Sequence, residues 1–157
     1  RRNVCESVSK KLNVKALRDV LVEDLNKIKN SISNDDYEKA RYVIEENERV
    51  KLFSEAIQVN DINKLGKLLY QSHEGLSTQY KVSCTELDFL VNRAKENPNV
   101  LGARMMGGGF GGCTINLVLK NVADDFAKEV SHNYLLEFGK SCSIYSLKLS
   151  AGTRVIK

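Results

Sequence analysis

The chain has 157 residues, of which 42% are hydrophobic and 28% are charged, and this length and composition predict one globular domain with a sizeable core. Its 24 basic and 20 acidic residues give a net charge of +4 and are spread along the sequence, which argues against a nucleic-acid partner. No apolar run approaches the roughly 18 residues that a membrane span needs, so no membrane partner is expected.

The cysteines predict a reduced protein without a metal site. Cys5, Cys84, Cys113 and Cys142 are far apart, form no C-x-x-C pair and are accompanied by only two histidines, which argues against zinc. Free thiols in a cytoplasmic protein are the simplest interpretation. The sequence begins without methionine and enters a helical pattern almost at once, so we expect a fragment of a longer polypeptide.

Helical patterns open the chain. Apolar residues recur at helical spacing in a short segment from Val4 to Leu12 and again from Leu17 to Ile28. The polar run 30–36 separates them from a long helix expected over 37–57, which has a stripe of period 3.6.

Two further helices are predicted by their starts and ends. Asp61 is an expected N-cap for a helix that reaches Leu76. Ser83 and Glu86 fit a capping box before another helix, which the only proline, Pro98, ends.

The period changes after Pro98. Val100 to Met106 is a predicted strand, and a second strand is predicted over 113–120, where apolar and polar residues alternate. A helix is expected around Phe126 to Tyr134. A third strand is expected from Ser143 to Leu149 and a short fourth from Thr153 to Ile156.

This order predicts the fold class. Helices over about 1–97, followed by strand, strand, helix and strand over about 98–157, suggest a single α+β domain over residues 1–157. The second part would be a ferredoxin-like strand-strand-helix-strand unit with an antiparallel sheet.

The segment "GARMMGGGFGGC", Gly102 to Cys113, holds six of the 10 glycines. A glycine inside an element costs roughly 0.5–1 kcal/mol relative to alanine, so this density needs a compensating contact. A bulged hairpin turn is one interpretation, although such turns need only one or two glycines. The functional interpretation is a backbone surface beside nucleotide phosphates, or beside the loop that holds them. Phe110 would then be an apolar anchor for the turn.

Three phosphate-binding patterns do not fit the glycines. Gly107, Gly109 and Gly112 satisfy G-x-G-x-x-G, but a strand rather than a helix follows them. The classical P-loop fails because Cys113 replaces its lysine. A protein kinase is excluded because only 45 residues follow Gly112 and they contain neither H-R-D nor D-F-G.

A family resemblance covers essentially the whole chain. "GARMMGGGFGGCTINLV" (102–118) resembles the third motif of the GHMP small-molecule kinases in its galactokinase form. "ESVSKKLNVKALRDV" (6–20), "KARYVIEENERV" (39–50) and "QSHEGLSTQYKVSCTELDFLV" (71–91) are similar to galactokinase segments in the same order. The resemblance therefore implies the C-terminal domain of a GHMP kinase.

The resemblance also implies a function. Galactokinases transfer the γ-phosphoryl group of ATP, with Mg²⁺, to the C1 hydroxyl of galactose, and the missing N-terminal domain would carry the catalytic groups. No residue here is assigned a catalytic or metal-binding role, and the isolated chain is expected to be inactive. The alternative is a non-catalytic, galactokinase-like sugar sensor.

The expected nucleotide-phosphate region comprises Gly107, Gly108, Gly109, Phe110, Gly111 and Gly112. Arg104 is a possible supporting residue that would orient the loop or meet a phosphate or carboxylate. His73 is expected to be a packing or surface residue rather than a base. Glu45, Glu46 and Glu48 are expected on a solvated helix face, with pairs such as Glu45 and Arg49.

Overall fold

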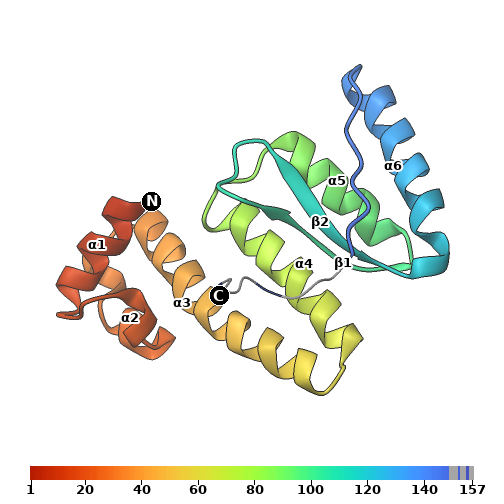
Figure 1. The fold of residues 1–157 in the computed structure, drawn as a ribbon. Helices are drawn as coiled ribbons and strands as arrows, with labels where there is room; N and C mark the ends of the chain where they lie inside the picture. The colour runs from red at the N-terminus through yellow and green to blue at the C-terminus, as the bar shows by residue number, and fades with distance from the viewer. Residues whose placement is uncertain (149–151, 153–154, 156–157) are drawn as a thin grey trace.

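The computed structural model describes residues 1–148, 152 and 155. Figure 1 shows a helical unit, formed by residues 1–44, and a second unit that contains the sheet. The long helix over 34–58 begins in the helical unit and leads to the second one. The elements in chain order are α1 (Arg2–Lys11), η1 (Leu17–Asp19), α2 (Val22–Lys27), η2 (Lys29–Ser31), α3 (Asn34–Gln58), α4 (Ile62–Thr78), α5 (Thr85–Glu96), β1 (Val100–Met106), β2 (Cys113–Val118), η3 (Lys120–Val122) and α6 (Ala123–Phe138).

Side-chain caps explain where the two central helices begin. The Ser33 hydroxyl accepts the Asp36 N–H at 3.0 Å before α3, and the Asp61 carboxylate accepts the Lys64 N–H at 2.9 Å before α4. The predicted Asp61 cap is therefore confirmed.

Two helix predictions are wrong in detail. Residues 17–28 form η1 and α2 rather than one helix, because Val20 is extended between them. The N-cap of α5 is Cys84 rather than Ser83, so Glu86 lies at N2 and not at the N3 position that a capping box requires.

The buried side chains form three clusters that follow this arrangement. The first lies between α1, η1, α2 and the first half of α3. The second joins α5, β1 and α6. The third joins α3, α4, α5 and β1 around Met105, next to the end of β1.

Strands β1 and β2 form an antiparallel hairpin. Its register runs from Met106 opposite Cys113 to Val100 opposite Val118, with an irregularity between Val100 and Gly102. Helices α4 and α5 pack against β1, and α6 packs against α5.

Two glycines allow α4 to approach β1 closely. A Cβ on Gly66 would lie 1.9 Å from the Leu101 carbonyl oxygen, and one on Gly102 would lie 2.5 Å from the Gly66 Cα. The first glycine of the sequence segment "GARMMGGGFGGC" therefore serves helix packing.

The predicted third strand is wrong over 143–148, which have no regular secondary structure and are largely exposed. Alternation of apolar and polar residues determines which side chains share a face, but a strand also needs the edge of another strand with which to pair. The sheet of the described residues contains β1 and β2 only. Leu149 and most of the predicted fourth strand lie outside the described residues, so the ferredoxin-like unit is seen here as strand, strand and helix.

No helix within the described part of the chain combines the length and the apolar character needed for a membrane crossing.

Candidate functional site

The candidate site is the loop Gly107–Gly112 between β1 and β2, called the glycine loop below. Four of its glycines have positive φ: Gly107 at +80°, Gly109 at +82°, Gly111 at +128° and Gly112 at +98°. Side chains with a Cβ rarely adopt these values, so the loop path depends on glycine. Phe110 also has a positive φ, of +59°.

Gly109 is the point at which the loop docks on the rest of the chain. The Phe110 N–H donates to the Val82 carbonyl oxygen at 2.7 Å. A Cβ on Gly109 would lie 2.1 Å from that same oxygen. Val82 belongs to the connection between α4 and α5, so Gly109 is required by a contact inside the chain.

The other loop glycines have open space around them. A Cβ on Gly107, Gly108 or Gly111 would meet nothing within 4 Å, and one on Gly112 would meet only the Met106 carbonyl oxygen, at 4.0 Å. The φ values restrict three of these positions, but Gly108 is restricted neither by a positive φ nor by a neighbour. The loop therefore presents an uncovered surface on the side away from Val82.

The sequence had suggested that the Phe110 side chain anchors the turn, but the structure does not show this. Its side chain is 72% exposed. The anchor is its backbone N–H, which donates to the Val82 carbonyl oxygen.

Arg104, on β1, is engaged with a carboxylate of this chain. Its Nη1 lies 3.1 Å from Oε1 of Glu46 on α3, and the Ser72 hydroxyl of α4 donates to the same oxygen at 2.6 Å. Arg49 pairs with the other carboxylate oxygen. The Arg104 guanidinium thus meets a carboxylate, which is one of the roles expected for it. This ion pair ties β1 to α3.

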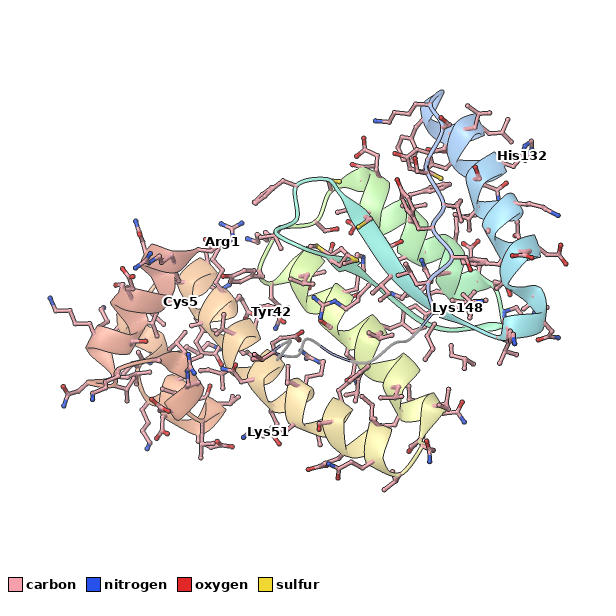
Figure 2. All side chains as sticks on the ribbon, in the orientation of Figure 1. Arg1, Cys5, Tyr42, Lys51, His132 and Lys148 are labelled. Atoms are coloured by element: carbon pink, nitrogen blue, oxygen red, sulfur yellow. The ribbon has the colours of Figure 1, made fainter. Side chains whose placement is uncertain are left out.

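This network corrects the interpretation of the acidic turn on α3. Glu46 faces α4 and β1 instead of solvent, whereas Glu48 is exposed as expected. The pairs of these three carboxylates on the helix are Arg41 with Glu45, Arg49 with Glu46 and Lys51 with Glu48, and the expected pair of Glu45 with Arg49 is not among them. Tyr42, marked on α3 in Figure 2, lies beside the network. Burial, helped by the Glu46 carboxylate, raises the pKa of Tyr42 to about 12. Its hydroxyl therefore stays protonated at neutral pH.

The connection on which the loop docks is held by the helical unit. Arg1, marked in Figure 2, donates from Nε to the Tyr80 carbonyl and from Nη2 to the Lys81 carbonyl, each at 2.6 Å. Lys81 Nζ lies 2.7 Å from an Asp35 carboxylate oxygen at the start of α3. Arg1, which precedes α1, and Asp35 of α3 thus fix the segment that carries Val82.

Sequence reasoning located the loop, and His73 is a buried packing residue, as expected. The contacts of Glu46 and His73 with β1, and of Val82 with the glycine loop, were not foreseen. The position of His73 beside Ser72 on α4 was the one sequence feature that pointed to a buried contact. Val82 acts through its backbone carbonyl, and no sequence pattern marks that contact. Among the described residues, no group of three or more His, Cys, Asp or Glu side chains could hold a metal ion.

Comparisons with known proteins show the family of the chain. The family model described as GHMP kinases C terminal matches residues 53–135, which include α4, α5, both strands and most of α6. A galactokinase of Thermotoga petrophila is 39% identical over 156 residues, and human galactokinase is 35% identical over 156 residues. Each alignment covers 99% of this chain, but 43% and 39% of the respective relative.

A solved structure shows the same fold. The crystal structure of Lactococcus lactis galactokinase complexed with galactose matches with a TM-score of 0.85 and 33% identity. The match covers 92% of this chain and 37% of that one. The chain therefore spans about two-fifths of the length of these relatives, and it belongs to the GHMP kinase family as a C-terminal domain.

Proposed function

We propose that the chain is the C-terminal domain of a galactokinase, in which it supports the nucleotide phosphates during ATP-dependent phosphorylation of galactose at the C1 hydroxyl. The observation that carries the proposal is the open side of the glycine loop. Gly107, Gly108 and Gly111 have no neighbour where a side chain would be. The similarity to galactokinases over 99% of the chain supports the choice of substrate.

The loop is suited to anions in two ways. Alternating right- and left-handed conformations let successive backbone N–H groups form an anion-binding concavity, and Gly107 and Gly109 have positive φ on either side of Gly108, which does not. The missing side chains allow a phosphate, or the backbone that holds it, to approach closely. The Val82 contact holds the loop, and the Arg104–Glu46 contact holds the preceding strand on α3, so the loop needs little reorganisation when the nucleotide binds.

The chemical step requires groups from outside this chain. The described residues contain no group of three or more His, Cys, Asp or Glu side chains that could hold a metal ion, and no step through Mg²⁺ is assigned to them. We propose that the catalytic groups lie in the part of the relatives that this chain does not span. The isolated 157-residue chain should therefore give no ADP release with ATP and galactose.

A cytoplasmic location is proposed with the kinase. All four cysteines are free in the structure, as expected in a reducing compartment. ATP and galactose would be the small-molecule partners, and the N-terminal domain of the same protein would be the macromolecular one.

The proposal is tested with the full-length protein that contains this chain. We expect ADP release with Mg-ATP and galactose, and not with N-acetylgalactosamine, arabinose or mevalonate. Binding of ATP and galactose without turnover would favour the sugar sensor instead.

Gly108 provides the sharpest test of the loop. Gly108→Asp places a negative charge on the open side, and we expect kcat/KM for ATP to fall at least about tenfold, the effect of roughly 1.4 kcal/mol. Gly108→Asn has the same shape without the charge, and should reduce kcat/KM much less. An unchanged kcat/KM in Gly108→Asp would contradict a position near phosphates.

A further inference from the structure

His73 is a buried histidine that the proposed function does not use. It lies on α4 with 3% of its surface exposed, between β1 and α5. Both ring nitrogens face a partner on another element. A buried imidazole with two partners holds those elements in one arrangement.

The Nδ1 atom receives a hydrogen bond from β1. The Met105 N–H donates to Nδ1 at 3.2 Å. Met105 is fully buried and is separated from the first residue of the glycine loop by Met106 alone. The imidazole therefore contacts the backbone of β1 close to where the loop begins.

The Nε2 atom faces α5. Asp88 Oδ1 lies 3.2 Å from Nε2. The contact does not have hydrogen-bond geometry, and Oδ1 is buried without a hydrogen-bond partner among the described residues. The other oxygen of Asp88 accepts the Ser77 hydroxyl at 3.0 Å. An acceptor role for Nδ1 requires the neutral tautomer with its proton on Nε2, and the carboxylate next to Nε2 is consistent with a proton there.

The charged groups around the ring do not alter this assignment. Burial lowers the pKa of His73, while Asp88 and Glu74 raise it and Lys95 lowers it. Burial is the largest of these effects, so the ring is neutral at pH 7. An imidazolium would carry a proton on Nδ1, directed at the Met105 N–H.

We propose that His73 is a positioning residue for the glycine loop, holding the end of β1 to α4 and α5 through Met105 and Asp88. The loop is then fixed on two sides, by His73 through β1 and by Val82 through the Phe110 N–H. Met105 and Val82 belong to the same buried cluster, so the two supports share one packed base. The consequence for catalysis rests on the kinase function proposed above.

Two variants separate the ring nitrogens in the 157-residue chain. The amide oxygen of His73→Asn can take the place of Nδ1, whereas the amide nitrogen of His73→Gln reaches toward the place of Nε2 and leaves the Met105 N–H without its acceptor. Gln substitution of His132, the other histidine and an exposed one on α6, is the matched control.

Amide hydrogen exchange measures the proposed support. We expect exchange at Met105 and in the glycine loop to rise about tenfold in His73→Gln, as the loss of one buried hydrogen bond allows, and to change little in His73→Asn and His132→Gln. Exchange at these amides that is unchanged in His73→Gln overturns the proposal. Ring ¹⁵N chemical shifts of the unmodified chain are a second measurement, and a proton on Nδ1 at pH 7 overturns it as well.

Kinetics of the full-length protein test the consequence. We expect His73→Gln to lower kcat/KM for ATP about tenfold, with rescue by His73→Asn and with KM for galactose unchanged. Equal losses in both variants would show general destabilisation and overturn the positioning role. If the unmodified full-length protein gives no turnover, the kinase proposal fails, and amide exchange alone decides the role of His73.

Discussion

At the scale of single residues, the six glycines of the segment Gly102–Cys113 have three different uses. Gly102 lets α4 approach β1, Gly109 lets the loop dock on Val82, and the remaining four line an open surface. Only the last group is available to a ligand or to another domain. A count of glycines in a motif therefore overstates how many of them face the ligand.

Gly107 lies in the open part of the loop and Gly109 docks on Val82. The two allow the energetic importance of the Val82 contact to be measured, because their φ values, +80° and +82°, are nearly equal. Gly107→Ala should cost about 1–2 kcal/mol of unfolding free energy for alanine in the left-handed region. Gly109→Ala should cost about 1–3 kcal/mol more, because its Cβ would overlap the Val82 carbonyl. Urea unfolding measures both, and equal losses would show that the Val82 contact has no energetic importance.

His73 makes a second prediction at this scale, for mild acid. Its pKa in the folded protein is lowered from 6.5, so below about pH 6.5 the unfolded chain binds a proton that the folded chain excludes. Stability should be complete above this pH and fall as the pH drops toward the lowered value.

His73→Asn serves as the comparison for this pH dependence. Thermal unfolding between pH 7 and pH 5 should show a smaller decrease in Tm for His73→Asn than for the unmodified chain. Parallel decreases would mean that other groups cause the acid sensitivity.

At the scale of elements, the contact between α4 and β1 places the site. Alanine normally stabilises a helix by about 1 kcal/mol relative to glycine, but a Cβ on Gly66 would enter the backbone of Leu101. Backbone atoms cannot move aside as a flexible side chain can. Glycine on this helix is therefore favoured by packing, against its own propensity.

Gly66→Ala should consequently destabilise the chain by at least about 1 kcal/mol, since overpacking of about 1–3 kcal/mol outweighs the gain in propensity. Lys67→Ala, at the next and exposed position of α4, should change stability by less than about 0.5 kcal/mol. Denaturant titration of both variants checks this, and a stabilised Gly66→Ala would show that α4 and β1 can separate at no cost.

The elements also show what the sequence could predict. Period and caps predicted α3, α4 and α6 because a helix depends on residues near one another in the chain. The strand expected over 143–148 was wrong because pairing depends on a distant partner that alternation does not specify. The docking of Gly109 on Val82 was likewise beyond prediction, because a carbonyl group is common to every residue.

At the scale of the whole molecule, ion pairs join the helical unit to the unit that carries the site. Asp35 on α3 pairs with Lys39 of its own helix and with Lys81, which directly precedes Val82. Val82 in turn accepts the Phe110 N–H. A charge at the start of α3 is thus two contacts away from the glycine loop.

Asp35→Asn should loosen this link. Hydrogen bonds from Lys39 and then Lys81 lower the pKa of Asp35 from 3.8 to about 2. The carboxylate therefore contributes stability above about pH 4 that is lost as the pH falls toward 2. The variant should be less stable than the unmodified chain at pH 7, should lose less stability between pH 4 and pH 2, and should show faster amide exchange at Phe110.

Asp36→Asn is the matched control, because it removes the same charge from the same turn of α3. Lys81→Met separates the two partners of Asp35, because it breaks the link to Val82 and leaves the pair with Lys39. If Lys81→Met speeds exchange at Phe110 as much as Asp35→Asn does, the helical unit acts on the loop through Lys81. If only Asp35→Asn has an effect, the pair with Lys39 stabilises α3, and the glycine loop is supported by Val82 and β1 without help from the helical unit.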